Sequence, residues 1–307
     1  MFNNSTIIIG LSGGPDSVFL LHTLAALREE KKLTLIAAHL DHEWRQDSAN
    51  DVLFCKEVAE NLSVTFVSKK ISELPLSFKA NGSKEEIGRK ARRYFFEQCA
   101  QEYNASAIAL AHHADDQQET FFIRLLRGAS LTGLTGIKPK DGLYVRPLLH
   151  MSKKEILDYL DKNNIRYLTD PSNQSADFLR NRIRNNVIPA LRECDDRFDQ
   201  NFESTHQQLQ QTEEFLNSHA TEILNSLQEN NILPLKELLA LHPVILNRIL
   251  ILWLISNKVS FVPSQGLLDE IIRFLKQPGN AKHSFYEKWQ IIKINGQISI
   301  ELFNKLL

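Results

Sequence analysis

A glycine-rich segment directly after an apolar run is the feature of this chain that most narrows its chemistry. Because Gly13 and Gly14 have no Cβ, backbone N–H groups there can approach phosphate oxygens at a helix N-terminus, where the helix dipole favours negative charge. Pro15 suits an early helical position, where its missing N–H would have no partner. We therefore expect a strand over 6–11, then a phosphate-binding turn and a helix. The turn consists of Ser12, Gly13, Gly14, Pro15, Asp16 and Ser17.

The spacing within this turn excludes two common nucleotide-binding loops. A Walker loop would end in Gly-Lys-Ser or Gly-Lys-Thr, and a dinucleotide fingerprint would read Gly-x-Gly-x-x-Gly. Residues 12–17 match neither pattern. The alternative interpretation is a glycine-rich turn that binds no ligand.

A second polar cluster, over 111–120, contains adjacent histidines and several carboxylates. Asp116 and Glu119 are three positions apart, so they share a face of any helix that starts near Ala114. Two carboxylates at the end of a strand can hold a metal ion or an ammonium group. The alternative is that Asp115 caps the helix N-terminus and that the remaining charges are solvated.

Two basic segments are candidates for binding anions. The first, 85–94, contains Arg89 and Arg92 in a dense cationic turn of an amphipathic helix. In the second, Arg180 and Arg184 are four positions apart and lie on one helical face. Like charges at such spacing repel one another unless anions neutralise them, which favours phosphate or carboxylate ligands. A solvated helix face is the alternative for each.

A third polar group follows the second apolar run. His39, Asp41 and His42 resemble a metal-binding set only loosely, because no third ligand is evident nearby. We expect contacts to nucleotide or substrate from these residues in preference to zinc binding.

The elements that must position these clusters are indicated by five apolar runs, with helical patterns between the first four. This alternation predicts an α/β fold with a doubly wound, mostly parallel sheet, in which ligands bind at the carboxyl ends of the strands. The polar clusters therefore belong to one crevice. The runs cover 6–11, 33–40, 64–68, 106–111 and 143–148.

The pattern changes after residue 185 to long helical stretches such as 202–227, with few strand signals. We predict a boundary near 189–199, which separates a catalytic domain over 1–190 from a smaller, mainly helical domain over 200–307. Asn295-Gly296 lies between two strand-like runs and predicts a terminal β-hairpin.

Composition sets broad limits. The 307 residues contain 36 Lys and Arg against 37 Asp and Glu, so nucleic-acid binding would have to come from local basic faces. Cys55, Cys99 and Cys194 are far apart, which argues against a disulfide framework or a structural zinc site. The N-terminus lacks a basic n-region and no apolar stretch reaches the length of a membrane span, so we expect a cytoplasmic location and no membrane association.

As a set, the motifs resemble the tRNA(Ile)-lysidine synthetase family of the PP-loop ATP pyrophosphatase superfamily. The resemblance spans about residues 6 to 190 and fades to a weak likeness around 278–294. Its motifs are 12–17, 88–93, 111–120, Leu126-Arg127-Gly128, Gly133-Leu134, Arg146-Pro147-Leu148, Asp170-Pro171-Ser172-Asn173 and 180–184.

The resemblance implies a PP-loop ATPase-type fold and a two-step reaction on the wobble cytidine of an isoleucine tRNA with the CAU anticodon. ATP adenylates the oxygen on carbon two of the base, and the side-chain amine of free L-lysine then displaces AMP. The implied cofactors are ATP, as a substrate, and Mg²⁺. The helical region after residue 200 is expected to contact tRNA phosphates.

The resemblance also implies a role for each candidate residue. Residues 12–17 bind ATP, and Asp16 holds Mg²⁺ and is catalytic. Asp116 and Glu119 bind the ammonium of lysine, and Arg184 its carboxylate. Arg92 stabilises charge on the α-phosphate or base oxygen, with His112 as a polar or proton-handling group. Arg89 and Arg180 are expected to contact tRNA or phosphate.

Some positions depart from the family pattern. The family usually has Asn at the position of Asp41, Gly at Glu43, and often an aromatic residue at Arg93. One alternative is another adenylating PP-loop enzyme, although thiolation generally needs paired or catalytic cysteines and amide formation from glutamine needs a glutaminase. A second alternative is a non-catalytic RNA-binding relative.

Overall fold

The computed structural model describes residues 3–75, 84–169, 179–259, 263–285 and 289–302. The chain divides into two compact units, Met1–Ser204 and Thr205–Leu307. Helix α10 (Phe198–Leu227) begins in the first unit and ends in the second. Within the described segments, no helix has both the length and the hydropathy needed to cross a lipid bilayer.

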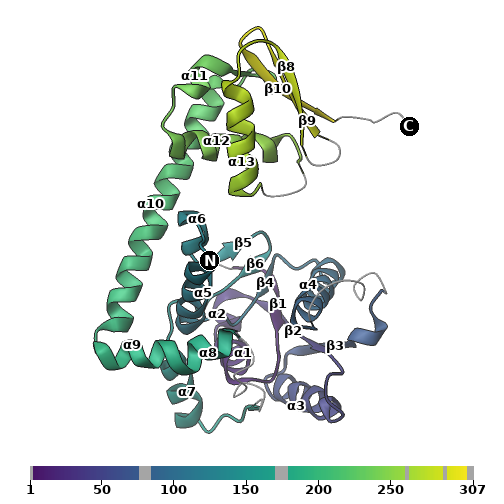
Figure 1. Ribbon diagram of the computed structural model, residues 1–307. Coiled ribbons are helices and arrows are strands. Elements are labelled where there is room, and N and C mark those ends of the chain that lie inside the picture. Colours follow the sequence, from purple (N-terminus) through teal and green to yellow (C-terminus); the bar gives the residue numbers. More distant parts are fainter. Residues whose placement is uncertain (1–2, 76–83, 170–178, 260–262, 286–288, 303–307) are drawn as a thin grey trace. The chain divides into compact units, whose positions relative to one another are not determined.

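Unit 1 is built on a six-stranded sheet with the order β3-β2-β1-β4-β6-β5 (Figure 1). All neighbouring strands pair in parallel except β5 and β6, which are antiparallel. The predicted mostly parallel sheet is confirmed, and only the short edge strand β5 was not expected. The strands are β1 (Thr6–Gly10), β2 (Thr34–Asp41), β3 (Thr65–Lys70), β4 (Ala107–Ala109), β5 (Lys140–Asp141) and β6 (Tyr144–Val145).

Both faces of this sheet are covered by helices, because alternate side chains of a strand point to opposite faces. Ile7 and Ile9 of β1 pack in one apolar cluster with side chains of α1, α3 and α7, whereas Ile8 packs in another with α4. A continuous apolar strand is therefore what a doubly wound sheet requires. These helices are α1 (Pro15–Ala26), α3 (Ser48–Asn61), α4 (Lys84–Glu102) and α7 (Lys153–Lys162).

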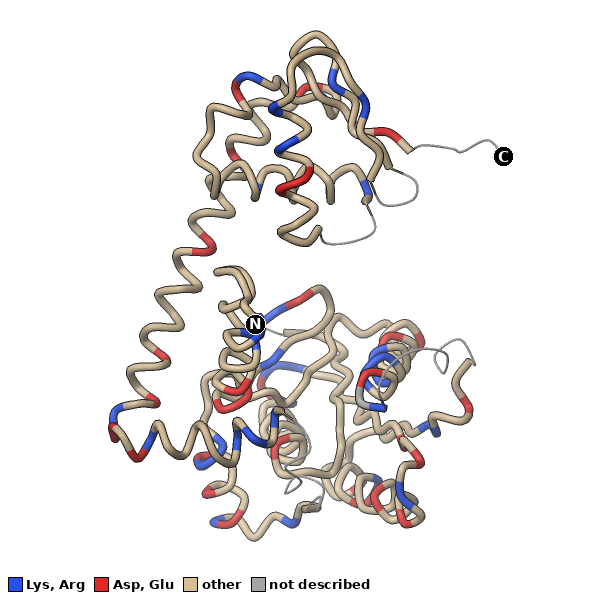
Figure 2. The backbone as a smooth tube through the Cα atoms, viewed as in Figure 1, with Lys and Arg blue, Asp and Glu red and all other residues tan. Residues whose placement is uncertain are grey.

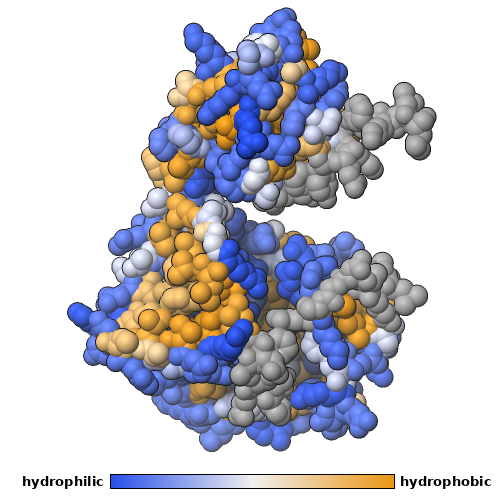
Figure 3. All heavy atoms as spheres, viewed as in Figure 1, coloured by the Kyte–Doolittle hydropathy of each residue, from blue (hydrophilic) through white to orange (hydrophobic). Residues whose placement is uncertain are grey.

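The remaining elements of unit 1 include α5, which follows β4 and carries the second polar cluster. Phe121 and Phe122 of α5 contact Phe198 and Phe202 at the start of α10, with ring centroids 5.2 to 6.4 Å apart. Figure 3 shows apolar side chains gathered over α5 and α6, where Leu125 and Leu126 are exposed. The elements are α2 (Arg28–Lys31), the 3-10 helix η1 (Ile71–Glu73), α5 (Ala114–Leu126), α6 (Leu131–Leu134), α8 (Leu179–Arg182), the π-helix η4 (Ile183–Val187) and α9 (Ile188–Cys194).

Unit 2 packs the end of α10 and three further helices around an antiparallel sheet with the order β7-β10-β9-β8. The predicted hairpin is confirmed as β9 and β10, with Asn295 and Gly296 both at positive φ, as a type I′ turn requires. Strands β7 and β8 were not expected. The elements are β7 (Leu233–Pro234), α11 (Leu235–Leu239), α12 (Pro243–Ser256), α13 (Gln265–Lys276), β8 (Ala281–Phe285), β9 (Trp289–Ile294) and β10 (Gln297–Leu302).

Two buried cations join elements within unit 2. Arg248 of α12 donates to both carboxylate oxygens of Glu213 on α10, at 2.7 and 2.5 Å, and to Asn217 at 2.8 Å. The ammonium of Lys293, which is 2% exposed, donates to the backbone carbonyls of Phe274 and Gln277 at the end of α13. Each buried charge is thus matched by acceptors, as burial in an apolar core requires.

Candidate active site

The glycine-rich loop connects β1 to α1, and hydrogen bonds of its two serines stabilise its conformation. The Ser17 hydroxyl donates to the Gly14 carbonyl at 2.9 Å and accepts from the Ser12 backbone N–H at 3.1 Å. Gly13 has φ of +82°, and a Cβ on it would lie 2.8 Å from Leu168 Cδ1. Gly14 is the N-cap of α1, and Pro15 occupies the first turn. The expected strand, turn and helix N-terminus are therefore present, and the first N–H groups of a helix have no partner within the helix itself.

The neighbouring strand β2 forms hydrogen bonds with Leu11, which directly precedes this loop. Leu11 donates its N–H to the Ala38 carbonyl, and its own carbonyl lies 2.9 Å from Nδ1 of His39. His39 is buried, and burial lowers its pKa, so the ring is neutral and its Nδ1–H can donate to that carbonyl. In this structure His39 therefore stabilises the start of the loop through its hydrogen bond to Leu11.

Asp41 and Glu43 form a tight turn after β2. The Asp41 carboxylate accepts the Glu43 backbone N–H at 2.8 Å, and Glu43 has φ of +53°. A left-handed backbone favours glycine, which accounts for the glycine that the family resemblance implies at this position. The hydrogen bond that the Asp41 carboxylate accepts from Glu43 stabilises this turn.

Asp16, in the first turn of α1, lies between two cations. Its Oδ1 is 2.5 Å from Nζ of Lys153, and its Oδ2 is 3.7 Å from Nε2 of His113. Burial would raise the pKa of Asp16, but the hydrogen bond with His113 and the charge of Lys153 hold it below its usual value. This carboxylate of the loop is therefore ionised at neutral pH.

His113 is surrounded by three carboxylates, those of Asp16, Asp115 and Asp116, at 3.5 to 3.7 Å. Burial alone would lower the pKa of His113, but these carboxylates raise it to about 9. The ring is therefore charged at neutral pH. A buried positive charge therefore lies next to Asp16 of the loop.

Asp115 does not cap its own helix, so that alternative interpretation is wrong. His113 is the N-cap of α5, and its backbone N–H is bound by Asp116 at 3.0 Å. Asp115 instead accepts the backbone N–H of Lys153 at 2.7 Å and pairs with Arg192 at 2.9 Å. It therefore stabilises the start of α7 and links it to α9.

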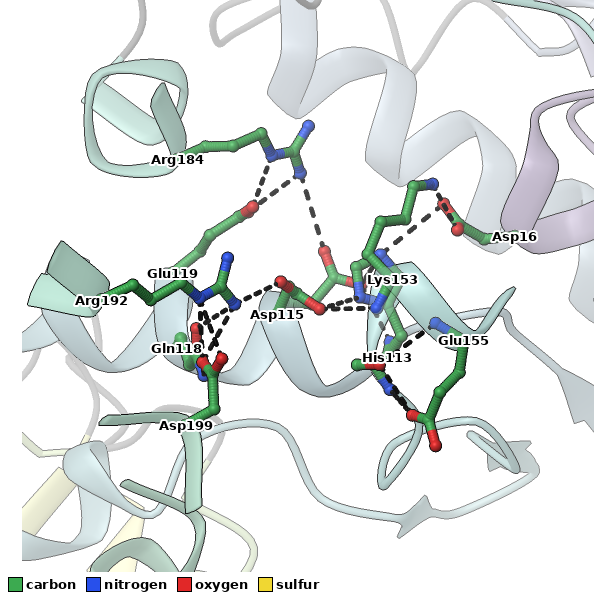
Figure 4. A network of polar contacts seen from close by, with 12 residues as sticks. Asp16, His113, Asp115, Gln118, Glu119, Lys153, Glu155, Arg184, Arg192 and Asp199 are labelled. Carbon is green, nitrogen blue, oxygen red and sulfur yellow. Dashed lines mark hydrogen bonds and ion pairs between the residues drawn. The ribbon is translucent and has the colours of Figure 1, made fainter. Parts of the chain in front are cut away.

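Asp116 and Glu119 share one face of α5, as their spacing predicts, and both bind arginines from the segment after residue 178. Figure 4 shows the contact between Glu119 and Arg184. Arg180 donates to Glu119 at 2.6 Å and to Asp116 at 2.9 Å. Arg184 donates to both oxygens of Glu119, at 2.5 and 3.0 Å. The common face predicted for the two arginines is thus bound to Asp116 and Glu119 of the protein itself. Arg184 belongs to a π-helix, a feature that is frequent at functional sites.

His112 precedes this cluster, and its buried Nδ1 atom has no hydrogen-bond partner among the described residues. Burial lowers the pKa of His112 to about 4, and the nearby Arg146 acts in the same direction. The imidazole is therefore neutral at pH 7. It can accept or donate a hydrogen bond, but it is a weak base.

The basic turn of α4 lies at the carboxyl end of β2, because Gly88 of this turn packs against residues that directly follow β2. A Cβ on Gly88 would lie 2.7 Å from Trp44, which stacks on His42 with ring centroids 4.5 Å apart. Arg89 and Arg92 are exposed on this helix, where Figure 2 shows a concentration of basic residues. Arg93 instead pairs with Glu97 and lies over the Tyr144 ring.

Four residues of the polar network were missed as site residues: His113, Asp115, Lys153 and Arg192. The His-His-x-Asp-Asp string itself signalled the first two, but the last two come from distant helices. The motif at 170–173 lies outside the described residues. Among the described residues, no group of three or more His, Cys, Asp or Glu side chains could hold a metal ion.

Comparison with known proteins agrees with this arrangement. The family model for the PP-loop domain matches residues 1–191, which include the loop, the carboxylate face of α5 and the two arginines. The chain belongs to the PP-loop domain family. Its glycine-rich loop, Ser12 to Ser17, is the PP-loop.

Curated relatives narrow the resemblance within that family. A tRNA(Ile)-lysidine synthase of Bacillus cereus is 37% identical over 230 residues, which are 73% of this chain and 48% of the relative. One of Clostridium perfringens is 41% identical over 193 residues, which are 62% of this chain and 41% of the relative. The resemblance inferred from the motifs is confirmed, and the chain spans about half the length of these relatives or less.

A solved structure supports the fold. The U34-tRNA thiolase from Methanococcus maripaludis, described with its [4Fe-4S] cluster, has a TM-score of 0.57 and 17% identity, and covers 67% of this chain and 73% of its own. At this identity the likeness concerns the fold alone. In the present chain Cys55 and Cys99 are buried and Cys194 is exposed.

Proposed function

We propose that this protein is a tRNA(Ile)-lysidine synthase. It joins free L-lysine to the wobble cytidine of an isoleucine tRNA with a CAU anticodon and releases AMP and pyrophosphate. The observation that carries the proposal is the joint presence of a PP-loop and, beside it, the buried Asp116–Glu119 carboxylate face, in a chain 37 to 41% identical to curated tRNA(Ile)-lysidine synthases. A cytoplasmic location is part of the same proposal.

The first step is an attack of the cytidine C2 oxygen on the α-phosphorus of ATP. An O–P bond forms, and the bond to the β-phosphate breaks, so that pyrophosphate leaves. The PP-loop N–H groups and the start of α1 would bind the phosphates, because a helix N-terminus and its dipole favour anions. Arg92 would stabilise charge on the α-phosphate or the base oxygen, with Arg89 as a further phosphate contact.

Mg²⁺ fits the residues beside the PP-loop. It is usually held by one or two carboxylates together with substrate phosphates, and Asp16 of the PP-loop supplies one ionised carboxylate. When bound, the ion would neutralise charge on the phosphates and on the departing pyrophosphate.

In the second step the side-chain amine of lysine attacks C2, a C–N bond forms, and AMP leaves with the oxygen. Asp116 and Glu119 would bind an ammonium group of lysine by charge, and Arg184 its carboxylate. In the structure these carboxylates hold Arg180 and Arg184, so lysine would have to displace guanidinium contacts.

His112 would act in this step through hydrogen bonding. A base whose pKa is about 4 cannot take a proton efficiently from an ammonium group near pH 7. Its Nδ1 atom, which has no hydrogen-bond partner in the part of the chain that the structure describes, would instead orient the cytidine base or the attacking amine. The helical residues after 200 would contribute contacts to tRNA phosphates.

The test is production of AMP and pyrophosphate from ATP with unmodified isoleucine tRNA, with and without lysine, followed by mass analysis of the tRNA. We expect release of AMP to depend on lysine, and the wobble cytidine to gain the mass of one condensed lysine. AMP without incorporation of lysine would favour another adenylating PP-loop enzyme, such as a thiolase or an amide-forming synthetase. No AMP from folded protein would favour a non-catalytic RNA-binding relative.

A further inference from the structure

The PP-loop carries no cation of its own. Ser12 to Ser17 contain no Lys, Arg or His, whereas a Walker loop contains a lysine that reaches the β- and γ-phosphates. Backbone N–H groups supply only partial charges, and the pyrophosphate that leaves ATP carries several full negative charges. A cation from another element would therefore strengthen binding at this loop.

Lys153 is an ammonium that already lies beside the loop. Its Nζ contacts Oδ1 of Asp16 at 2.5 Å, although the two residues are 137 positions apart in the chain (Figure 4). His113 also lies near Asp16, but its ring is 5% exposed and held between carboxylates, so it is not free to reach a ligand.

The backbone around Lys153 is fixed while its side chain is partly open to solvent. Ser152 caps α7 by accepting the Glu155 N–H, and the Lys153 N–H is bound by Asp115. The side chains of Lys153 and Asp16 are 32% and 28% exposed. Partly exposed ion pairs contribute little net free energy, so exchange of the carboxylate for a phosphate is not opposed by a strong contact.

We propose that Lys153 is the phosphate-binding cation of this PP-loop. Without nucleotide its ammonium lies on Asp16. With nucleotide it contacts the oxygens of the pyrophosphate moiety and stabilises that group as it leaves. This inference rests on the proposed function for the identity of the nucleotide, and it concerns a residue of α7 that lies outside the loop.

The experiment measures binding of inorganic pyrophosphate, ATP and adenosine to the full chain by calorimetry, in the presence of a chelator. Lys153→Met should weaken pyrophosphate and ATP binding by about tenfold or more, since a hydrogen bond to a charged group is lost. Binding of adenosine should be unchanged. Lys153→Arg should restore most of the affinity, because the guanidinium keeps the charge.

Lys154→Met is the matched control. Lys154 is the next residue of α7, its side chain is 84% exposed, and it pairs with Asp158 on its own helix. This variant should bind all three ligands like the wild type. The melting temperature of each variant reports whether a change in affinity reflects a loss of folded protein.

An Asp16→Asn background separates direct contact from an indirect effect. If Lys153 contacts phosphate, Lys153→Met weakens pyrophosphate binding in this background as well. If Lys153 only holds the Asp16 carboxylate, the second substitution has no further effect, and the inference is wrong. Equal pyrophosphate affinity of wild type and Lys153→Met, or no pyrophosphate and ATP binding by either, would also overturn it.

Failure of this inference and failure of the proposed function give different results. Lysidine formation together with unchanged phosphate binding by Lys153→Met would overturn the inference alone. Lys153-dependent phosphate binding without lysine incorporation would overturn the proposed function and leave Lys153 as a phosphate ligand of another adenylating enzyme.

Discussion

The Nε atom of Arg180 lies 2.6 Å from Oε2 of Glu119, a carboxylate that is 1% exposed. Arg184 binds the same carboxylate from the next helical turn. A substrate ammonium directed to this face would compete with cations that belong to the protein. The two arginines supply the counter-charges and hydrogen bonds that these buried carboxylates require.

Replacing Glu119 should therefore change the KM for lysine more than the KM for ATP. We expect Glu119→Gln to raise the KM for lysine by about ten- to a hundredfold, which is the effect of losing a charged hydrogen-bond partner, with the KM for ATP unchanged. Steady-state kinetics with each substrate varied in turn would show this. Glu203→Gln, at an exposed position on α10, is the control and should change neither constant. An unchanged KM for lysine would contradict the assignment of Glu119.

Adjacent glycines of the PP-loop should respond differently to alanine. Gly13→Ala should lower the free energy of unfolding by about 2 kcal/mol, because φ is +82° and the new Cβ would meet Leu168. Gly14 has φ of −70° and its nearest neighbour would be 3.6 Å away, so Gly14→Ala should cost less than about 1 kcal/mol. Urea unfolding of both variants measures the difference. Similar destabilisation by the two would contradict the described loop conformation.

The free energy of unfolding of unit 1 should decrease as the pH decreases, partly because His42 becomes protonated. Burial, with the charge of Arg92, lowers the pKa of His42 from 6.5 to about 4. The unfolded chain therefore binds the proton more readily, and stability is lost as the pH falls from about 6.5 towards 4. His42→Phe keeps a ring to stack on Trp44 and should lose about 1 kcal/mol less than the wild type between pH 7 and 5, as measured by urea unfolding. An equal loss in both proteins would exclude His42 as the cause.

The stability of unit 2 should depend on the buried ion pair between Arg248 and Glu213. Arg248→Met should reduce stability by about 3 to 5 kcal/mol, because it leaves the Glu213 carboxylate buried without a counter-charge. Adding Glu213→Leu should recover most of that loss. The exposed Arg273→Met is the control and should change stability by less than about 0.5 kcal/mol. A double variant no more stable than Arg248→Met would show that the cost lies in packing alone.

Local signals explain what could be predicted from the sequence. The strand and turn around Gly13 and the helix start near Ala114 follow from short apolar runs and their neighbours, and the shared face of Asp116 and Glu119 follows from their spacing. Lys153 and Arg192 could not be placed, because their partners are 137 and 77 positions away and the contacts depend on how α7 and α9 pack. Strand β8 was missed because Lys282, His283 and Ser284 resemble a polar connection.

The strand order of the small sheet has a consequence for synthesis of the protein. Strand β10 lies between β7 and β9, although it follows both in the sequence. A growing chain cannot complete this sheet until Leu302 has left the ribosome, whereas every described strand of unit 1 is available much earlier. Unit 1 can therefore fold first during translation. A chain interrupted before Gln297 would expose the edge of β9, where unpaired backbone groups can recruit strands from other molecules.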